Sequence, residues 1–265
     1  MSTNRRPGGS KGVTRQEIMA VAAAREIRND EVAFIGTGLP MVAAYLAKAT
    51  HAPDTVLVFE SGIVGAKPKE LATGVGDLRL LVGCLKSTGL YYALSLLQGG
   101  FIDIGFLGAA EVDEYGNLNS TAIGDYQRPT VRLPGSGGAN DIGSLARRLI
   151  IMVPHERRRL VPRVQYLTTP GFLDGPGARE RAGLRGEGPT RVITDLAVLD
   201  FDPTSKRMRL ATMHPGVTGE EVEARTGFPL LRVPRVGETP LPSDREVRLL
   251  RERIDPEGIY IGGKG

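Results

Sequence analysis

The sequence predicts an α/β fold: an open, mostly parallel sheet with helices on both faces, and mixed or antiparallel strands in the C-terminal half. Over the first 110 residues, short apolar runs alternate with helical patterns, which is typical of parallel strands joined by helices. After residue 148, five apolar runs follow one another closely, which favours mixed or antiparallel pairing. The chain shows no internal repeat and no Pro/Ser-rich linker. We therefore expect a disordered tail at residues 1–12 and a single domain over residues 13–265.

Each element of the first half follows from a local signal. Thr14 and Glu17 form the pattern of a capping box, so a helix is expected over residues 14–28. The run Val32–Ile35 ends in Gly36-Thr37-Gly38, which indicates a strand leading into a glycine turn. The other predicted elements of this half are helices at Leu39–Ala49 and Tyr91–Leu97 and strands at Thr55–Phe59 and Phe101–Leu107.

The second half is expected to hold several strands. The Gly- and charge-rich segment Leu173–Glu187 indicates a long loop between them. Two further capping patterns, at Thr218–Glu221 and Ser243–Glu246, predict late helices. The predicted strands are Leu149–Val153, Val164–Thr168, Arg191–Asp195, Ala197–Phe201 and Arg209–Thr212.

Composition excludes several classes of function. Aromatic residues make up 5% of the chain, without Trp, and the net charge is only +4, which argues against a nucleic-acid surface. No apolar run reaches 18 residues, so no membrane span is expected. The single cysteine, Cys84, excludes an internal disulfide and predicts a cytoplasmic location. Because Cys84 lies in an apolar stretch, we expect it to be a buried small hydrophobe.

Glu60 is the first candidate for chemistry. It follows directly on the apolar strand Thr55–Phe59 and precedes Ser61 and Gly62. Ligands of open α/β sheets bind at the carboxyl ends of strands, where Glu60 and the Gly36–Gly38 turn are both predicted to lie. Partial desolvation favours a carboxylate there as a nucleophile, and Gly62 leaves room for a substrate. The alternative from position alone is a strand-end acid paired with an arginine.

A loop of small residues, Gly135–Asp141, is the second candidate. Its backbone N–H groups are unobstructed by side chains, so the loop can present two amides to an oxyanion or a phosphate. Asn140 or Asp141 can cap a helix that follows, with Leu145–Arg148 helix-like. The loop does not match the glycine pattern of a dinucleotide site. A simple tight turn is the alternative.

Glu111 and Asp113 form a third group. They follow the strand Phe101–Leu107 and share one side if that strand continues. Paired acids can perform acid–base chemistry, but no histidine accompanies them, so we expect no metal site.

These motifs together resemble the β-type subunits of family I coenzyme A-transferases over roughly residues 14–255. The resemblance rests on seven stretches of the sequence that occur in the same order in that family. These stretches are Phe59–Gly62, Gly108–Asp113 with Tyr115–Asn117, Gly135–Asp141, Tyr166–Thr168, Gly171–Glu180, Gly188–Thr194 and His214–Val217.

The resemblance implies a mechanism and a set of site residues. Glu60 matches the glutamate that forms an acyl anhydride and then a CoA thioester, and the amides around Gly137, Gly138 and Ala139 match the loop credited with stabilising the oxyanion. Coenzyme A is thus a substrate and covalent intermediate, with no permanently bound cofactor. An α-type subunit is the implied partner, in an α2β2 heterotetramer. Residues expected near substrate or CoA are Ser61, Gly62, Gly36, Gly38, Glu111 and Asn140.

Several alternatives stay open. A similar heterodimer of steroid degradation hydrolyses a carbon ring, but its β-type chain lacks Glu-Ser-Gly, so the motif of this chain favours transfer. A non-catalytic CoA- or phosphate-binding module, or a sugar-phosphate isomerase-like protein, would need the glycine loops but not Glu60. Position 111 holds Glu where relatives often carry Gln. Arg128, Arg132 and Lys67 are candidates to pair a distal substrate carboxylate or are ordinary surface cations.

Overall fold

The computed structural model describes residues 12–67 and 69–262. In these residues the strands are β1 (Val32–Phe34), β2 (Val56–Phe59), β3 (Ile63–Val64), β4 (Lys86–Ser87), β5 (Ile104–Leu107), β6 (Glu111–Asp113), β7 (Leu118–Asn119), β8 (Ala122–Gly124), β9 (Pro129–Arg132), β10 (Arg148–Met152), β11 (Leu160–Val161), β12 (Gly188–Ile193), β13 (Ala197–Phe201), β14 (Met208–Met213) and β15 (Leu231–Glu238). The helices are α1 (Arg15–Ala24), α2 (Leu39–Ala49), α3 (Leu90–Gln98), α4 (Ala139–Leu145), α5 (Ala178–Arg181), α6 (Gly219–Ala224) and α7 (Asp244–Leu249), with a 3-10 turn η1 (Leu78–Leu81) and a π-helical turn η2 (Leu250–Ile254).

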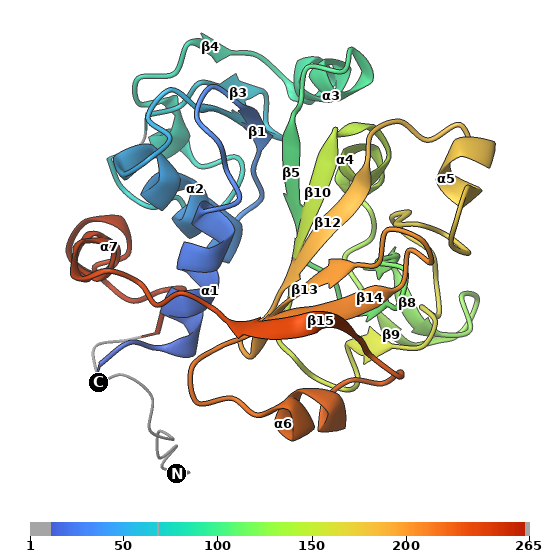
Figure 1. Ribbon diagram of the computed structural model, residues 1–265. Coiled ribbons are helices and arrows are strands. Elements are labelled where there is room, and N and C mark those ends of the chain that lie inside the picture. Colours follow the sequence, from blue (N-terminus) through green and yellow to red (C-terminus); the bar gives the residue numbers. More distant parts are fainter. Residues whose placement is uncertain (1–11, 68, 263–265) are drawn as a thin grey trace.

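A ten-stranded sheet forms the centre of the molecule, in the order β15-β14-β13-β12-β10-β5-β1-β2-β3-β4 (Figure 1). Strands β2, β1, β5, β10 and β12 run parallel. Antiparallel pairs extend the sheet on both sides, and β15 adds in parallel to β14. The α/β class, the parallel centre and the mixed C-terminal half are therefore as predicted. The predicted tail lies outside the described residues except for Gly12.

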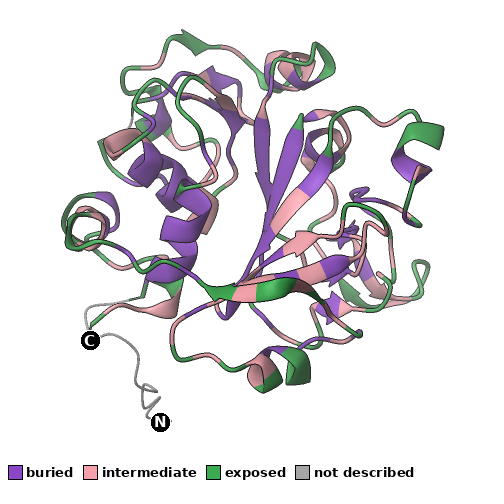
Figure 2. Cartoon of the chain, viewed as in Figure 1, coloured by how far each residue is buried: buried purple, intermediate pink, exposed green. Residues whose placement is uncertain are grey.

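Helices cover both faces of the parallel strands, also as predicted. Alternate side chains of β10 point to opposite faces, so Ile150 packs with α1 and α2 while Ile151 packs with α3 and α4. Figure 2 shows the central strands buried and the edge strand β15 largely exposed or half-buried. Burial on both faces is what parallel strands require.

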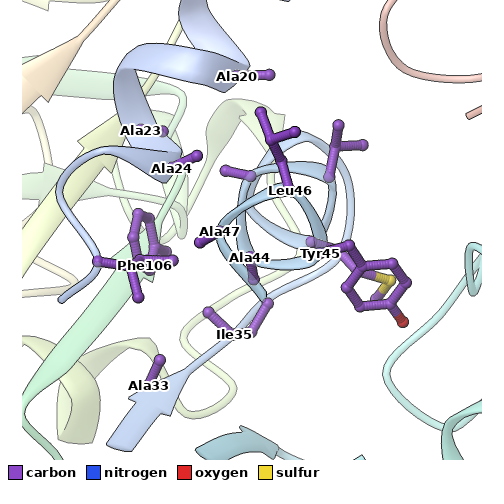
Figure 3. Packing of buried hydrophobic residues seen from close by; sticks show 14 of the residues in the cluster. Ala20, Ala23, Ala24, Ala33, Ile35, Ala44, Tyr45, Leu46, Ala47 and Phe106 are labelled. Atoms are coloured by element: carbon purple, nitrogen blue, oxygen red, sulfur yellow. The ribbon is translucent and has the colours of Figure 1, made fainter. Parts of the chain in front are cut away.

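Small side chains bring α1 and α2 together. Ala23 and Ala24 of α1 lie beside Ala47 of α2, next to Phe106 of β5 (Figure 3). Cys84 is half-buried and packs against this same cluster. The predicted role of Cys84 as a small core residue is therefore met only in part.

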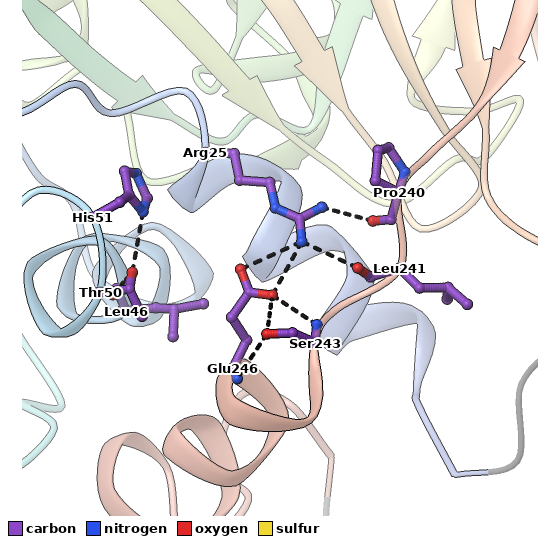
Figure 4. Close-up of polar contacts among 8 residues, drawn as sticks. All are labelled: Arg25, Leu46, Thr50, His51, Pro240, Leu241, Ser243 and Glu246. Carbon is purple, nitrogen blue, oxygen red and sulfur yellow. Dashed lines mark hydrogen bonds and ion pairs between the residues drawn. The ribbon is translucent and has the colours of Figure 1, made fainter.

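The C-terminal segment packs back onto α1. Arg25 donates hydrogen bonds to the carbonyl oxygens of Pro240 (2.7 Å) and Leu241 (3.1 Å) and to the Glu246 carboxylate (3.1 Å) (Figure 4). Glu246 in turn accepts from the backbone N–H of Ser243, which completes the predicted capping box of α7. These contacts hold residues more than 200 positions apart in sequence side by side.

The start of α1 has a similar long-range link. Thr14 and Glu17 form the predicted capping box. The buried Glu17 carboxylate also pairs with Arg251, whose Nε lies 2.5 Å from Oε1. The Thr14 hydroxyl donates to the carbonyl oxygen of Ile261 (3.3 Å). The first helix is therefore tied to the last described segment of the chain.

Some predicted elements differ from the structure. The helix expected over 14–28 ends at Ala24, and the strand expected from Phe101 begins only at Ile104. Residues 164–168, predicted as a strand, are irregular. Gln165 and Thr168 form hydrogen bonds with side-chain and backbone groups of the β6–β7 region, and the segment does not pair with a neighbouring strand. Of the segment Leu145–Arg148, predicted as helix-like, only Leu145 is helical, since α4 ends there and β10 begins at Arg148. The predicted loop 173–187 contains the short helix α5.

Candidate active site

Glu60 lies directly after β2, at the carboxyl end of the strand, and is half-buried. Its Oε1 accepts a hydrogen bond from the backbone N–H of Gly138, at 3.0 Å. Gly138 is the N-cap residue of α4. The first two sequence candidates, 78 positions apart, are thus in direct contact.

The glycines of the loop leave room for this close contact. A Cβ at Gly137 would lie 3.4 Å from Glu60 Oε1, and one at Gly138 would lie 3.3 Å from it. Gly137 also has a φ of +48°, which side chains disfavour. The amide of Ala139, in contrast, donates to the carbonyl oxygen of Ser136 (2.9 Å), so it is already engaged. Of the three amides expected to act together, Gly138 is the one bonded to Glu60.

A packing contact and a hydrogen bond hold α4 and its loop in place. Gly105 of β5 lets α4 approach the sheet, because a Cβ there would lie 2.4 Å from Ile142 Cγ2. Asn140 donates its side-chain N–H to the carbonyl oxygen of Thr168 (3.0 Å). Asn140 does not cap α4, as one prediction had it, because Gly138 takes the N-cap position and the Asn140 side chain anchors the loop. Its predicted place near substrate stays a prediction.

The Ser61–Gly62 turn follows Glu60 directly and is fixed by its contacts with Thr88 and Gly89. Gly62 has a φ of +95°, and a Cβ there would lie 2.5 Å from the backbone N of Gly89, so only glycine fits. The Gly62 carbonyl accepts from both the N–H (3.0 Å) and the hydroxyl (2.6 Å) of Thr88. The Oγ of Ser61 is buried and finds no hydrogen-bond partner in the described residues.

Gly36 and Gly38 border a separate cavity. Thr37, between them, lines a cavity of about 310 Å³ together with Gly108, Met152 and Asp195. Met152 is the last residue of β10, and the other three follow β1, β5 and β12, so the cavity lies at the carboxyl ends of the parallel strands where the strand order reverses. Glu60 does not line it.

Glu111 and Asp113 are buried in the small sheet β11-β6-β7. The Glu111 carboxylate accepts from Asn119 Nδ2 (2.7 Å) and from the backbone N and Nε2 of Gln165 (2.9 and 2.6 Å). Asp113 binds Asn117, and burial raises the pKa of Asp113 even though these hydrogen bonds act against it. Both acids therefore organise their own loops. The described residues hold no cluster of three or more His, Cys, Asp or Glu that is suited to a metal ion.

The three cations predicted as candidates for a distal substrate carboxylate occupy two separate places. Arg132 donates to the carbonyl oxygen of Tyr126 and stacks on its ring, and Arg128 is exposed in the same hairpin region. Lys67 lines a different cavity. None of the three has a hydrogen bond or ion pair with Glu60 among the described contacts.

Arg179 was missed by sequence reasoning. It is buried, and its guanidinium donates to the carbonyl oxygens of Gly171 (2.8 Å), Arg185 (2.7 Å) and, in α4, Gly143 (3.2 Å). Burial lowers the pKa of Arg179. Its position within the motif Gly171–Glu180 was the one available signal.

Known proteins resemble the chain over nearly all of its length. The profile of the coenzyme A transferase family matches residues 16–225. The B subunit of glutaconate CoA-transferase from Acidaminococcus fermentans is 42% identical over 254 residues, covering 94% of this chain and 95% of that protein. The crystal structure of that transferase matches with a TM-score of 0.90, at 40% identity, over 96% of this chain and 99% of the other.

Two further relatives mark the range of activities. The B subunit of 3-oxoadipate CoA-transferase from Pseudomonas knackmussii is 43% identical over 237 residues, covering 89% of this chain and 91% of that protein. A cholesterol ring-cleaving hydrolase subunit of Mycobacterium tuberculosis is 30% identical over 255 residues, covering 93% of this chain and 96% of that protein. The two transferase subunits are therefore clearly more similar to this chain than the hydrolase subunit. No helix within the described ranges has the length and apolarity needed to cross a bilayer.

Proposed function

This chain belongs to the coenzyme A transferase family, and from that premise we propose that it is the β-type subunit of an enzyme that moves CoA from an acyl-CoA donor to a carboxylic acid by way of Glu60. The observation that carries the proposal is the 3.0 Å hydrogen bond from the Gly138 N–H to Glu60 Oε1. This contact supports the proposal because a carboxylate that can act as a nucleophile lies against a backbone N–H that can stabilise an oxyanion.

The proposed reaction is a two-stage covalent transfer. A carboxylate oxygen of Glu60 attacks the thioester carbonyl of the donor, the C–S bond breaks, and an acyl-glutamyl anhydride and CoA thiolate result. The thiolate attacks the glutamyl carbonyl carbon, and the donor acid leaves with an oxygen that came from Glu60. The acceptor carboxylate then attacks the glutamyl-CoA thioester, and the same steps in reverse give the new acyl-CoA and restore Glu60.

Gly138 has a defined part in this scheme. Each attack on the glutamyl carbonyl places negative charge on the oxygen derived from Oε1, which the Gly138 N–H can stabilise without rearrangement. The buried, unpartnered hydroxyl of Ser61 is available to an oxygen of the substrate. Coenzyme A is a substrate and covalent intermediate here and is not permanently bound.

An α-type subunit is the proposed partner, in an α2β2 heterotetramer. The two transferase relatives are named as B subunits. The exposed apolar side chains of the segment 78–91, which we call the apolar ridge, offer such a partner a surface, because exposed apolar groups mark interaction sites. The segment contains Gly89, which contacts Gly62. This apolar ridge consists of Leu78, Leu81, Val82, Leu85, Leu90 and Tyr91. We place the protein in the cytoplasm because of its single cysteine, and residues 13–265 in one domain.

The nucleophile is tested with the reconstituted pair of subunits. Incubation with an acyl-CoA followed by borohydride or hydroxylamine should inactivate the enzyme only when acyl-CoA is present, with the modification at Glu60. Glu60→Gln should abolish transfer, and Glu60→Asp should be severely impaired because the attacking oxygen is displaced. Glu257→Gln, at an exposed acid, is the matched control. Near-normal transfer by Glu60→Ala would remove Glu60 from the nucleophile role.

Transfer and hydrolysis differ in whether the reaction requires an acceptor acid. Exchange should require a carboxylic acid, and glutaconate and 3-oxoadipate, the acids in the relatives' names, are the first to test. Free CoA or a ring-opened product formed without acceptor would assign the chain to the hydrolase branch. CoA binding without any exchange would indicate a non-catalytic role.

A further inference from the structure

A second cavity, of about 330 Å³, lies between α2, η2 and the segment around Lys67, away from Glu60. Lys48, at the end of α2, donates to the carbonyl oxygens of Pro53 (2.8 Å) and Thr55 (2.5 Å). Thr55 immediately precedes β2, whereas Glu60 follows it, so the length of the strand, about 13 Å, separates the two ends. The cavity is also on the α1–α2 face of the sheet, opposite α4.

The lining of this cavity is strongly cationic. Lys48, Lys67, Lys69 and Arg253 face one carboxylate, that of Glu70. None of the four cations forms an ion pair with any described acid. The pKa of Lys48 is lowered, first by burial and then by the charge of Lys67. Lys67, Lys69 and Arg253 are exposed at the rim of the cavity, and like charges that line one cavity repel one another unless an anion lies among them.

Tyr45 adds an independent observation. Its ring extends from α2 away from the alanines that face α1 (Figure 3), and it lines the same cavity. The residue is 8% exposed, yet its hydroxyl has no hydrogen-bond partner in the described residues. Burial raises the pKa of Tyr45, so the hydroxyl keeps its proton and remains a donor. A buried donor without an acceptor is rare in native proteins and indicates a missing partner.

We propose that this cavity is a binding site for a phosphate-type polyanion, held by Lys67, Lys69 and Arg253 and hydrogen-bonded by the Tyr45 hydroxyl. Phosphate oxygens carry the negative charge that would pair with the cations. They also accept hydrogen bonds, so one of them can accept from the Tyr45 hydroxyl. Two sources share this chemistry: free inorganic phosphate or pyrophosphate, and the phosphate-bearing end of a CoA substrate.

The experiment uses the chain assembled with its α-type partner and measures pyrophosphate binding by calorimetry at constant ionic strength. Lys67→Ala/Lys69→Ala should weaken binding at least tenfold, and Tyr45→Phe several-fold. Tyr45→Phe should also raise Tm in the absence of ligand, because it removes a buried donor that has no partner. Arg235→Ala is the control, since Arg235 is exposed on β15, at the other end of the sheet.

The outcomes separate the possibilities. If the source is a CoA substrate, the double lysine variant raises KM for acyl-CoA; if it is free phosphate, KM is unchanged while pyrophosphate binding weakens. Both results support the site. No saturable binding of pyrophosphate, or equal weakening by Arg235→Ala, overturns it. Glu60→Ala should bind pyrophosphate normally, so this test does not depend on the proposed transfer mechanism.

Discussion

The backbone N–H of Gly138 lies 3.0 Å from Glu60 Oε1, and no side chain separates the two residues. Gly138→Ala keeps the N–H and an allowed φ of −79°, but its Cβ would lie 3.3 Å from Oε1 and 3.4 Å from Leu94 Cδ2. The carboxylate must shift away from the donor. We expect kcat to fall, by at most roughly 10²-fold, which is the order of effect seen when an oxyanion donor is removed altogether, with little change in Tm.

Steady-state kinetics and thermal unfolding check this expectation together. Gly74→Ala is the control, because a Cβ at Gly74 meets nothing within 4 Å. Unchanged kcat in Gly138→Ala would show that the hydrogen bond to Glu60 has no part in the chemistry.

His155 gives the fold a pH dependence. Its ring is buried between the hydroxyls of Thr194 (2.9 Å) and Thr226 (3.0 Å), and burial lowers its pKa from 6.5 to about 4. The unfolded chain therefore binds a proton between pH 6.5 and 4 that the folded chain does not, so stability is lost as pH falls through this window. The expected loss from this group is about 3 kcal/mol in the free energy of unfolding.

Urea denaturation at a series of pH values tests this prediction. His155→Gln should flatten the pH dependence between pH 6.5 and 4, while His51→Gln, at an exposed histidine, should not. The same slope in wild type and His155→Gln would assign the effect to other groups.

Sequence reasoning at the residue scale located the contact between Glu60 and the glycine loop but not its details. An acid at a strand end and a run of small residues are visible as residue types. The sequence does not reveal which backbone N–H of the loop can bind Glu60, because the N–H of Ala139 donates to the carbonyl oxygen of Ser136 within the local turn. The partners of Glu111 are not visible either, because its three hydrogen bonds come from Asn119 and Gln165, and Gln165 is 54 positions away.

At the scale of elements, the segment 171–187 is held onto α4 by Arg179. Arg179→Met would leave the carbonyl oxygens of Gly171, Arg185 and Gly143 without their donor in a buried place. We expect the free energy of unfolding to fall by about 2–4 kcal/mol. Arg181→Met, two positions on and exposed, is the control and should be nearly neutral in urea denaturation.

Because Gly143 belongs to α4, the Arg179 change should also reach the site. We expect a lower kcat in Arg179→Met that Arg179→Lys restores in part, since lysine keeps a cation that can donate. A fully active Arg179→Met enzyme would show that α4 keeps its position without the hydrogen bonds of Arg179.

Elements with strong local signals were predicted accurately, and those set by tertiary contacts were not. The capping boxes at Thr14 and Ser243 and the helix Leu39–Ala49 agree with the structure. Residues 164–168 have strand-like composition, yet Gln165 and Thr168 bind the β6–β7 region. Such pairing between distant segments leaves no periodic pattern in the sequence.

For the whole molecule, the apolar ridge predicts assembly. Tyr91 is 88% exposed and Leu85 is 71% exposed, both close in sequence to the Gly89 that contacts Gly62. Leu85→Ser/Tyr91→Ser should weaken association with the α-type subunit at least tenfold while leaving the Tm of this chain nearly unchanged. Analytical ultracentrifugation of mixed subunits measures this, with Ile259→Ser, also exposed, as the control. Undiminished assembly would place the interface elsewhere.

The overall architecture could be foreseen because it depends on repeated patterns. Alternation of apolar runs and helical segments indicated parallel strands, and closely spaced runs indicated the mixed half. The neighbours of each strand could not be foreseen to the same degree, since β5 pairs with both β1 and β10 through contacts that span long stretches of chain.

The link between Glu17 and Arg251 has a consequence for synthesis of the chain. The two residues are 234 positions apart, so at usual ribosomal speeds Arg251 is added roughly 10–50 s after Glu17. During that interval the nascent first helix carries an acid that has not yet met its cationic partner. We therefore expect a chain released before residue 251 to be cut by proteases more readily than the finished protein.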